Sequence, residues 1–307
     1  MIGTDFDYLR PTSVREALEA ASRHEDARFL AGGHALLPEW KLGRTRPPTL
    51  IDLSRIAELR GIEVVSGSGQ TGADGEADAV VRIAAMTTSA EIEYSPDIAR
   101  YAPLLAEAAA VISDPLIRNR ATLGGSLAGA PPRGDWPPVV LAADATVHLR
   151  SRDGERAVPA REFFTRDGAG TDQGSTTLRP GELLTSITVP GADGRARSTY
   201  LKRMHPASGH AMIGVAVAAV FDNGGTCRDC RIAITGTATA ATRAPRAEAE
   251  LAGSALSPES IEAAAQAARG EIAFTGDEFG SAAYLAEVLP IYVSRALSHL
   301  ATPSSNA

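Results

Sequence analysis

Two Gly-Gly pairs constrain the fold of this chain more than any other feature of its sequence. One lies in AGGHALLPEWKLG at residues 31–43, and the other lies in IRNRATLGGSLAGAPPRGD at residues 117–135. Each pair stands between an apolar run and a possible helix, so each predicts a tight turn. Because glycine has no Cβ, such a turn can take positive φ and direct adjacent backbone N–H groups at one anion. We therefore expect both turns to bind the same pyrophosphate.

The composition is that of a globular protein with two or three packed units. A chain of 307 residues with 44% hydrophobic side chains can bury substantial cores. No window approaches 18 consecutive apolar residues, and the N-terminal residues lack the basic start and apolar centre of a signal peptide. We therefore expect a cytoplasmic protein with no membrane span.

The charge of the chain disfavours two classes of partner. Its net charge is −7, whereas general nucleic-acid binders and anionic-membrane binders need a positive surface. Nearly all the positive charge is arginine, and the only lysines are Lys41 and Lys202. We expect no nucleic acid as a partner.

The two cysteines, Cys227 and Cys230, form a C-x-x-C pair. Iron–sulfur clusters and structural zinc sites usually need four ligands, which two cysteines cannot supply. The pair follows an Asn-Gly-Gly turn and begins a predicted strand, so residues i and i+3 are expected to face opposite sides of a sheet. This spacing therefore indicates a structural role.

Self-contained hydrolysis and metal catalysis have no support in the sequence. None of the six histidines stands in a metal-ligand spacing such as H-E-x-x-H, and no G-x-S-x-G motif is present. Gly67, Gly69 and Gly72 do match G-x-G-x-x-G, but no apolar helix pattern follows them. We interpret that stretch as a loop between two strands.

The order of predicted elements indicates an α+β protein. A helix capped at Ser13 with Glu16 as a capping box, a strand at 27–31, a helix at 35–42 and a strand at 49–54 form a βαβ-like unit to about residue 55. Strands at 62–65 and 79–85 and helices from residue 88 to residue 144 follow. A Gly- and Thr-rich linker then places a domain boundary near residue 178.

The remainder predicts a second α+β domain. Long strands at 183–190, 198–204, 210–221 and 230–236 precede helices near 246–251, 258–269 and 282–300. Strands followed by helices favour helices on one face of an antiparallel sheet.

Four segments together resemble the flavin-binding medium subunits of molybdenum hydroxylases, the family of xanthine dehydrogenase and aerobic carbon monoxide dehydrogenase. They are AGGHALLPEWKLG, TLIDLS, DPLIRNRATLGGS and LKRMHPASGHAMIGVAVA, in the family's order and spacing. The resemblance covers essentially the whole chain. It implies an FAD-binding domain of the vanillyl-alcohol-oxidase (PCMH) type at residues 1–178, with subdomains at about 1–55 and 56–178, and a smaller carbon monoxide dehydrogenase flavoprotein-like domain at 179–307.

The same resemblance implies the cofactor site. FAD is expected to bind without a covalent bond, with its diphosphate against both glycine segments. The implied contacts are Ala31, Gly32, Gly33, His34, Ala35 and Leu36 in the first segment, Thr122, Gly124, Gly125, Ser126 and Asp135 in the second, and Lys202 and His210 near the flavin ring. The sequence departs from the family at Ala35, Pro131 and His210, where relatives often carry serine, an acidic residue and tyrosine.

The function implied is electron transfer. The chain has no ligands for iron–sulfur or molybdenum, so by resemblance its FAD receives electrons from a small subunit with [2Fe–2S] clusters. A large molybdopterin subunit oxidises the organic substrate, and the complex is expected to be a dimer of heterotrimers. Two alternatives stay open, a stand-alone flavin oxidase with flavin linked to His34, and a flavin-free scaffold subunit.

Overall fold

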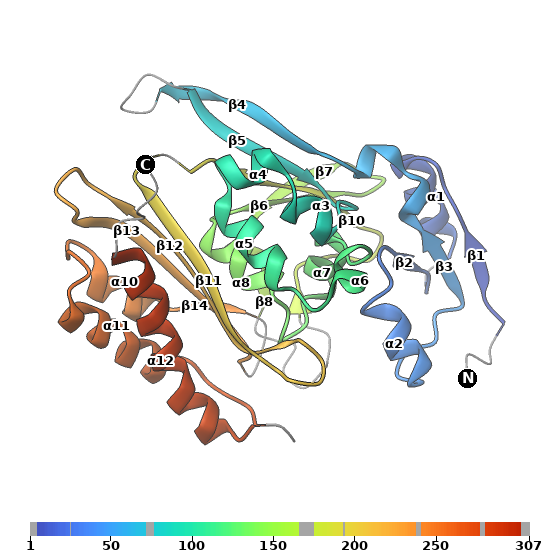
Figure 1. Cartoon of the computed structure of the whole chain (residues 1–307). Helices are drawn as coiled ribbons and strands as arrows, with labels where there is room; N and C mark the ends of the chain where they lie inside the picture. The colour runs from blue at the N-terminus through green and yellow to red at the C-terminus, as the bar shows by residue number, and fades with distance from the viewer. Residues whose placement is uncertain are drawn as a thin grey trace.

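The computed structural model describes residues 5–24, 26–71, 77–165, 175–192, 194–237, 241–276 and 280–301. Three groups of elements follow one another along the chain and lie side by side in space (Figure 1). The N-terminal group occupies one end of the molecule, the C-terminal helices occupy the opposite end, and residues 117–135 lie between them. Over the described residues, the chain forms no helix with the length and apolar character needed to cross a membrane.

The N-terminal group is a small parallel sheet with its helices. Its elements are β1 (Asp7–Leu9), α1 (Val14–Arg23), β2 (Arg28–Leu30), α2 (Leu36–Lys41), β3 (Thr49–Asp52) and two 3-10 turns, Leu53–Arg55 and Ala57–Leu59. The strand order is β1-β3-β2, so β2, α2 and β3 form the predicted βαβ unit, and β1 is an added strand that the sequence analysis did not predict.

The predicted cap of α1 is correct in one half. Ser13 is the N-cap, and its Oγ accepts from the N–H of Glu16. The carboxylate of Glu16 accepts from the N–H and hydroxyl of Thr12 rather than from Ser13. Ser13 therefore provides an acceptor for one N–H group in the first turn of the helix. The carboxylate of Glu16 instead holds Thr12, the residue before the cap.

The middle group is built on an antiparallel sheet of order β4-β5-β10-β6-β7. Its strands are β4 (Ile62–Thr71), β5 (Ala77–Ala84), β6 (Thr146–Arg150), β7 (Glu155–Pro159) and β10 (Leu183–Pro190). Strands β8 (Phe164–Thr165) and β9 (Ser175–Thr176) pair antiparallel in a separate two-stranded sheet. Gly67 and Gly69 lie within strand β4 and not in the predicted loop, because β4 extends to Thr71. Strand β4 pairs antiparallel with β5. Gly72 lies outside the described residues.

Strand β10 differs from the sequence expectation. The predicted boundary near residue 178 would assign this strand to the second domain, yet it pairs with β5 on one side and β6 on the other. Its buried Ile187 and Val189 join the core of the middle group. The middle sheet thus extends to Pro190. The linker before β10 does not mark the end of this sheet, because the hydrogen-bond partners of a strand decide the sheet to which it belongs.

Helices cover one side of the middle sheet. They are α3 (Ser89–Glu93), α4 (Pro96–Tyr101), α5 (Pro103–Val111), α6 (Pro115–Arg118), α7 (Leu123–Gly129), α8 (Trp136–Ala142) and the short α9 (Ala160–Phe163). Within the stretch predicted as helical from residue 88 to residue 144, helices α4 and α5 are separated at Ala102. Pro103 causes the break, since it donates no backbone N–H and disfavours helical geometry at the preceding residue.

The C-terminal group is a four-stranded antiparallel sheet, β11 (Ala196–Met204), β12 (Ala211–Phe221), β13 (Cys227–Thr235) and β14 (Thr242–Arg243). The helices α10 (Pro245–Leu251), α11 (Pro258–Glu271) and α12 (Ala282–Ala301) cover one face of this sheet, as predicted (Figure 1). Helices α5 and α8 of the middle group cover the other face.

Strand β12 shows how the two covered faces are encoded. Ile213, Val215 and Val217 belong to the core under α10–α12, whereas Ala216 and Ala218 contact the core of the middle group. Successive side chains of a strand point to opposite faces. The large residues therefore fill the gap to the C-terminal helices, and the small ones let α8 approach closely.

The C-x-x-C pair corrects one prediction. Cys227 and Cys230 are both buried in the core under α10–α12, so they face the same side and not opposite sides. The register of β13 against β12 shifts between Val220 and Phe221, which leaves Arg228 as an extra residue in a β-bulge. This inserted residue reverses the alternation, and the two free thiols become packing neighbours.

We expect Leu289→Ala to lower the free energy of unfolding by about 3 kcal/mol, as is typical for a cavity left in a closed core. Leu289 is fully buried where α12 packs on the sheet, whereas Ile291 on the same helix is 49% exposed. Urea denaturation of both variants measures the difference, with Ile291→Ala expected to change stability by less than about 1 kcal/mol. Equal losses at the two positions would contradict the packing of α12.

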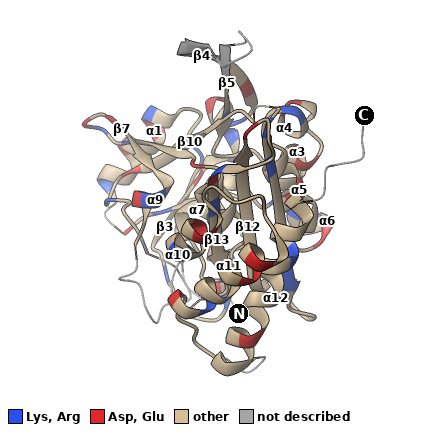
Figure 2. Cartoon of the chain, turned by 90° about the vertical axis from the view of Figure 1, so that its left-hand side faces the viewer, with Lys and Arg blue, Asp and Glu red and all other residues tan. Residues whose placement is uncertain are grey.

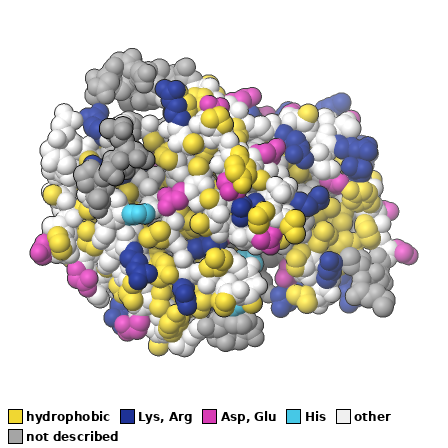
Figure 3. Space-filling view, viewed as in Figure 1, with side chains coloured by type: hydrophobic (Ala, Val, Ile, Leu, Met, Phe, Trp, Pro, Cys, Tyr) yellow, Lys and Arg dark blue, Asp and Glu magenta, His cyan; other side chains and the backbone are white. Residues whose placement is uncertain are grey.

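Charged side chains of both signs are interspersed over the described residues. In Figure 2 acidic and basic segments alternate along the helices and loops, and in Figure 3 they lie between hydrophobic side chains over the visible face.

Candidate functional site

The two glycine segments lie in direct contact. A Cβ built on Gly32 would overlap the carbonyl oxygen of Arg120, and one built on Gly125 would lie 3.1 Å from the Cβ of Ala31. One turn of helix further, a Cβ on Gly129 would lie 3.9 Å from the Cβ of Ala35. Glycines at these positions therefore let the first segment pack along residues 120–129.

The first segment forms the predicted turn. Gly33 has a φ of +81°, which favours glycine, and the turn ends where α2 begins at Leu36. Among the described residues, no acceptor is present for the backbone N–H groups of Gly32, Gly33, His34 and Ala35. A run of N–H groups without internal acceptors, close to a helix start, suits an anion.

The second segment differs from its prediction. Gly124 and Gly125 lie in the first turn of α7 rather than in a turn before it, and neither has positive φ. The N–H of Gly124 donates to the carbonyl oxygen of Ala85 (2.8 Å), and the N–H of Gly125 donates to Oγ1 of Thr122 (3.2 Å). These N–H groups are therefore occupied within the protein, and the polar atoms that the segment can present are hydroxyls, those of Thr122 and Ser126.

A cavity of about 380 Å³ opens beside the first turn. It is lined by Tyr8, Arg10, Leu30, Ala31, Gly32, Gly33, Leu37, Asp52, Ser54 and Arg120. Burial acts to raise the pKa of Asp52, but hydrogen bonds from Tyr8 and Ser54 and the nearby Arg10 outweigh it, so the pKa is lowered and the carboxylate is held ionised. The cavity thus combines the free backbone donors of the turn with charged side chains of both signs.

His34 lies exposed at the first turn. Partial desolvation and the positive charge of Arg120 lower its pKa, while Asp114 acts in the opposite direction. The imidazole is therefore mostly neutral near pH 7 and contributes a hydrogen-bonding group instead of a full positive charge.

The other end of residues 117–135 carries a buried ion pair. Nζ of Lys202 lies 3.0 Å from Oδ1 and 3.2 Å from Oδ2 of Asp135, and the two side chains are 4% and 6% exposed. The hydroxyl of Tyr200 also donates to Oδ1 of Asp135 at 2.7 Å. Desolvation raises the pKa of Asp135, and the charge of Lys202 and these hydrogen bonds counteract the rise.

His210 lies at the same end of the site. It stands directly before β12, its N–H donates to the hydroxyl of Ser208, and its carbonyl oxygen accepts from the N–H of His205. Desolvation lowers the pKa of its imidazole, and the charge of Asp135 acts against that shift. Nζ of Lys202 donates to the carbonyl oxygen of Gly209, which ties this loop to the ion pair.

Residues 117–135 thus connect the two ends of the site. They pack on Gly32 at one end, and at the other the carbonyl oxygen of Pro132 accepts from the hydroxyl of Thr235 and the N–H of Gly236, both at 2.9 Å. An elongated ligand could therefore contact the N-terminal turn, α7 and the C-terminal sheet together. The structure groups the predicted residues into the turn at 31–36 against α7, and Asp135 with Lys202 and His210.

Comparison with known proteins decides the family. Residues 4–192 match the FAD binding domain in molybdopterin dehydrogenase, and residues 182–300 match the CO dehydrogenase flavoprotein C-terminal domain. The chain belongs to the FAD-binding medium subunits of the molybdenum hydroxylases. The predicted family and fold class are confirmed, and FAD is the cofactor of the family's binding domain.

Relatives of this family cover nearly the whole chain. The carbon monoxide dehydrogenase medium chain of Hydrogenophaga pseudoflava is 37% identical over 299 residues, covering 97% of this chain and 98% of its own. A 6-hydroxypseudooxynicotine dehydrogenase complex subunit alpha of Paenarthrobacter nicotinovorans is 33% identical, with coverage of 98% and 97%. These relatives are dehydrogenase subunits, so the chain is an oxidoreductase subunit.

Solved structures of the family share the fold. A chain of carbon monoxide dehydrogenase from Hydrogenophaga pseudoflava superposes with a TM-score of 0.87 at 38% identity, covering 97% of this chain and 98% of the other. A chain of quinoline 2-oxidoreductase from Pseudomonas putida 86 has a TM-score of 0.84 at 26% identity, with 97% of each chain covered.

Several residues of the site were missed by the sequence analysis. Tyr200 is two residues before Lys202 on β11, so the strand period alone places both side chains on one face. No local sequence pattern marks Arg120, Tyr8 or Asp52 as part of the site, because only tertiary contacts bring them to the first turn.

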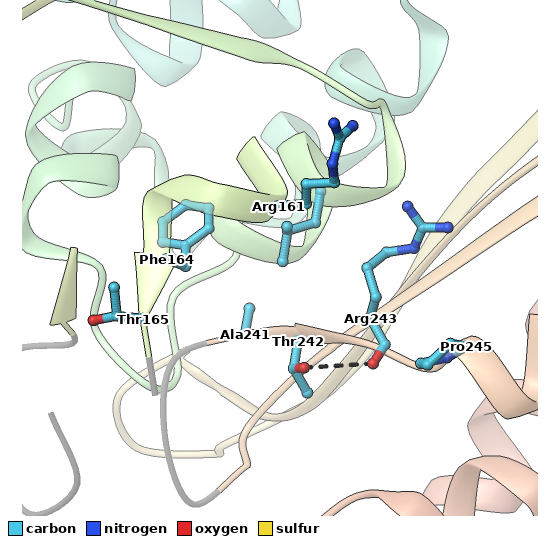
Figure 4. A pocket seen from close by; sticks show the side chains of 8 residues that line it. Arg161, Phe164, Thr165, Ala241, Thr242, Arg243 and Pro245 are labelled. Carbon is cyan, nitrogen blue, oxygen red and sulfur yellow. Dashed lines mark hydrogen bonds between the residues drawn. The ribbon is translucent and has the colours of Figure 1, made fainter. Parts of the chain in front are cut away.

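A second cavity, of about 230 Å³, lies away from the glycine segments, between the α9–β8 region and β14 (Figure 4). Its two arginines already have carboxylate neighbours. Arg243 pairs with Glu248 at 2.5 Å, and Arg161 lies 3.3 Å from Glu162 and 3.7 Å from Asp144. Compensated charges of this kind do not mark an anion site.

Proposed function

We propose that this chain is the FAD-bearing electron-transfer subunit of a molybdenum-containing hydroxylase or dehydrogenase complex. It receives electrons from a small iron–sulfur subunit and passes them to an external acceptor, while a large molybdopterin subunit oxidises the organic substrate. A relative named as the medium chain of carbon monoxide dehydrogenase supports a role as one subunit of a larger complex, and a solved structure of Cu,Mo-CO dehydrogenase supports molybdenum in such a complex. The proposed assembly is a dimer of heterotrimers. The proposed compartment is the cytoplasm.

The observation that carries the proposal is the contact between the first turn and residues 120–129, which places two sets of polar groups side by side. Within the described part of the chain, the N–H groups of Gly32, Gly33, His34 and Ala35 have no acceptor, which suits a diphosphate. Thr122 and Ser126 add hydroxyls, and Asp135 can accept from ribityl or ribose hydroxyls. Lys202 and His210 would lie at the flavin ring. The residues present therefore fit an extended dinucleotide.

The roles of Gly32, Gly124 and Gly125 are steric. Each removes a side chain where the first turn, Ala85 and α7 approach one another, so the turn can lie flat against α7. When bound, FAD supplies the chemistry of accepting and delivering electrons singly or in pairs. The chain's own residues bind it, orient it and exclude water from it.

FAD titration tests this proposal. We expect the purified chain to bind FAD, seen as quenching of flavin fluorescence, and all yellow colour to pass an ultrafiltration membrane after denaturation. Colour retained with the chain would instead support flavin bonded to His34 in a stand-alone oxidase. Absence of flavin bands after reconstitution would support a flavin-free scaffold subunit.

Partner exchange tests the electron-transfer role. The FAD-loaded chain mixed with a reduced iron–sulfur subunit from the same source should lose its absorbance near 450 nm without any organic substrate. A flavin that binds normally and stays oxidised in that mixture would contradict the assigned direction of electron flow.

A further inference from the structure

Tyr200 is a polar residue at the bottom of the cofactor site that none of the predicted roles uses. Its side chain is 2% exposed and belongs to the core of the middle group. A buried phenol needs a hydrogen-bond partner, and this one donates to Oδ1 of Asp135 at 2.7 Å. Desolvation raises the pKa of Tyr200 well above its ordinary value, so the phenol keeps its proton and remains a donor.

The sheet is built to accommodate this hydroxyl. Gly214 of β12 is the cross-strand partner of Lys202, and a Cβ on Gly214 would overlap the Tyr200 hydroxyl. The same Cβ would also lie 2.8 Å from Cγ2 of Thr235. Glycine at position 214 therefore leaves the space in which the tyrosine reaches Asp135.

The hydrogen bonds of Asp135 are divided unequally between its two oxygens. Oδ1 accepts from both Tyr200 and Lys202, whereas among the described residues Oδ2 accepts only from Lys202, at 3.2 Å. A carboxylate has about four lone-pair positions, two on each oxygen. Oδ1 is therefore saturated from the protein side, and Oδ2 keeps a position for an outside donor.

From this geometry we propose that Tyr200 is a positioning residue, which fixes Asp135 so that Oδ2 points to a cofactor hydroxyl and Lys202 stays beside the flavin end. The inference rests on the proposed FAD site and adds to it the residue that orients Asp135. Tyr200 itself does not touch the cofactor. The segment 117–135 is thus held at its C-terminal end by a contact from β11.

The pH dependence of FAD binding depends on the charged and titratable groups that face Asp135 within the described residues. They are Tyr200 and Lys202 from β11 and His210 from the loop before β12. The bond from Tyr200 acts to lower the pKa of Asp135. Its removal therefore raises that pKa, and Asp135 takes up a proton at a higher pH than in the wild type.

Tyr200→Phe tests the proposal, because it removes only the hydroxyl. We expect the dissociation constant for FAD to rise on the order of tenfold near pH 8, the loss of one hydrogen bond to a charged group. As the pH is lowered, the gap to the wild type should widen, since Asp135 of the variant is protonated at a higher pH than in the wild type and then no longer attracts Lys202. Tyr292→Phe, at a half-buried tyrosine in the other core, is the matched control.

Gly214→Ala is the second variant, which keeps the hydroxyl but displaces it. It should reproduce the weaker and more pH-dependent binding of Tyr200→Phe, with circular dichroism confirming the fold of both. Wild-type affinity and pH profile in a folded Tyr200→Phe chain would overturn this inference alone. A wild-type chain that binds no FAD would overturn the proposed function, and this inference with it.

Discussion

The Gly125→Val variant is expected to fold and to bind FAD at least about 100-fold more weakly than the wild type, the equivalent of one or two lost charge-assisted hydrogen bonds. At Gly125 even a Cβ would lie 2.8 Å from Oγ1 of Thr122 and 3.1 Å from the Cβ of Ala31. The two γ-methyl groups of valine would separate α7 from the first turn, whose N–H groups would then no longer face the diphosphate. Equilibrium dialysis against FAD measures the loss.

Gly129→Ala is the matched control for this variant. Gly129 lies on the same face of α7 one turn later, where an added Cβ would make an ordinary contact of 3.9 Å with Ala35. We expect its FAD content to equal that of the wild type. Normal flavin content in a folded Gly125→Val chain would refute the placement of the diphosphate between these two segments.

The Lys202→Met variant is expected to lose about 3–5 kcal/mol of unfolding free energy at pH 8, the usual result of leaving one member of a buried ion pair without its partner. Asp135 is 6% exposed, so water cannot replace the lost ammonium. Adding Asp135→Asn should restore most of the loss, because the remaining group is then neutral. Guanidinium denaturation of both variants, without FAD, measures these differences.

The pH dependence of this loss has a definite sign. The pKa of Asp135 is already raised above its ordinary value of 3.8, and Lys202 acts to lower it, so the variant raises it further. The folded state then binds more protons than the unfolded state between the two pKa values, and stability falls as the pH rises through that window.

Lys41→Met provides the control, since Lys41 is the other lysine of the chain and is exposed on α2. Its expected effect is within about 0.5 kcal/mol, as for most surface substitutions. A Lys202→Met chain as stable as the Lys41→Met chain at every pH would show that Asp135 is not held ionised by Lys202.

The sequence predicted the local elements well where one signal acted over a few residues. Ser13 caps α1 as its side chain indicates. The sequence did not predict that the side chains of Cys227 and Cys230 lie on the same face of the sheet. One bulged residue between them reverses the alternation of side chains along the strand, and a bulge depends on the register with the neighbouring strand.

In the cofactor site, too, some features could be predicted from the sequence and others depend on tertiary contacts. The resemblance in four segments located the glycine pairs, and their proximity is confirmed by Gly32 against Arg120. The expectation that Gly124 and Gly125 form a turn before a helix was wrong, because both lie in the first turn of α7, where their N–H groups donate to Ala85 and Thr122. The partner of a backbone donor is a tertiary contact, and no local pattern encodes it.

The family followed from the resemblance in four segments. Most of the local helices and strands, and the two glycine segments, could be predicted because helix caps, apolar periodicity and glycine placement act within a few residues. The tertiary structure alone decided which N–H groups remain free, that β10 pairs within the middle sheet, and that Tyr200 reaches Asp135 over Gly214. These outcomes depend on contacts between residues far apart in the chain, where close packing and the need to satisfy buried polar groups select one arrangement.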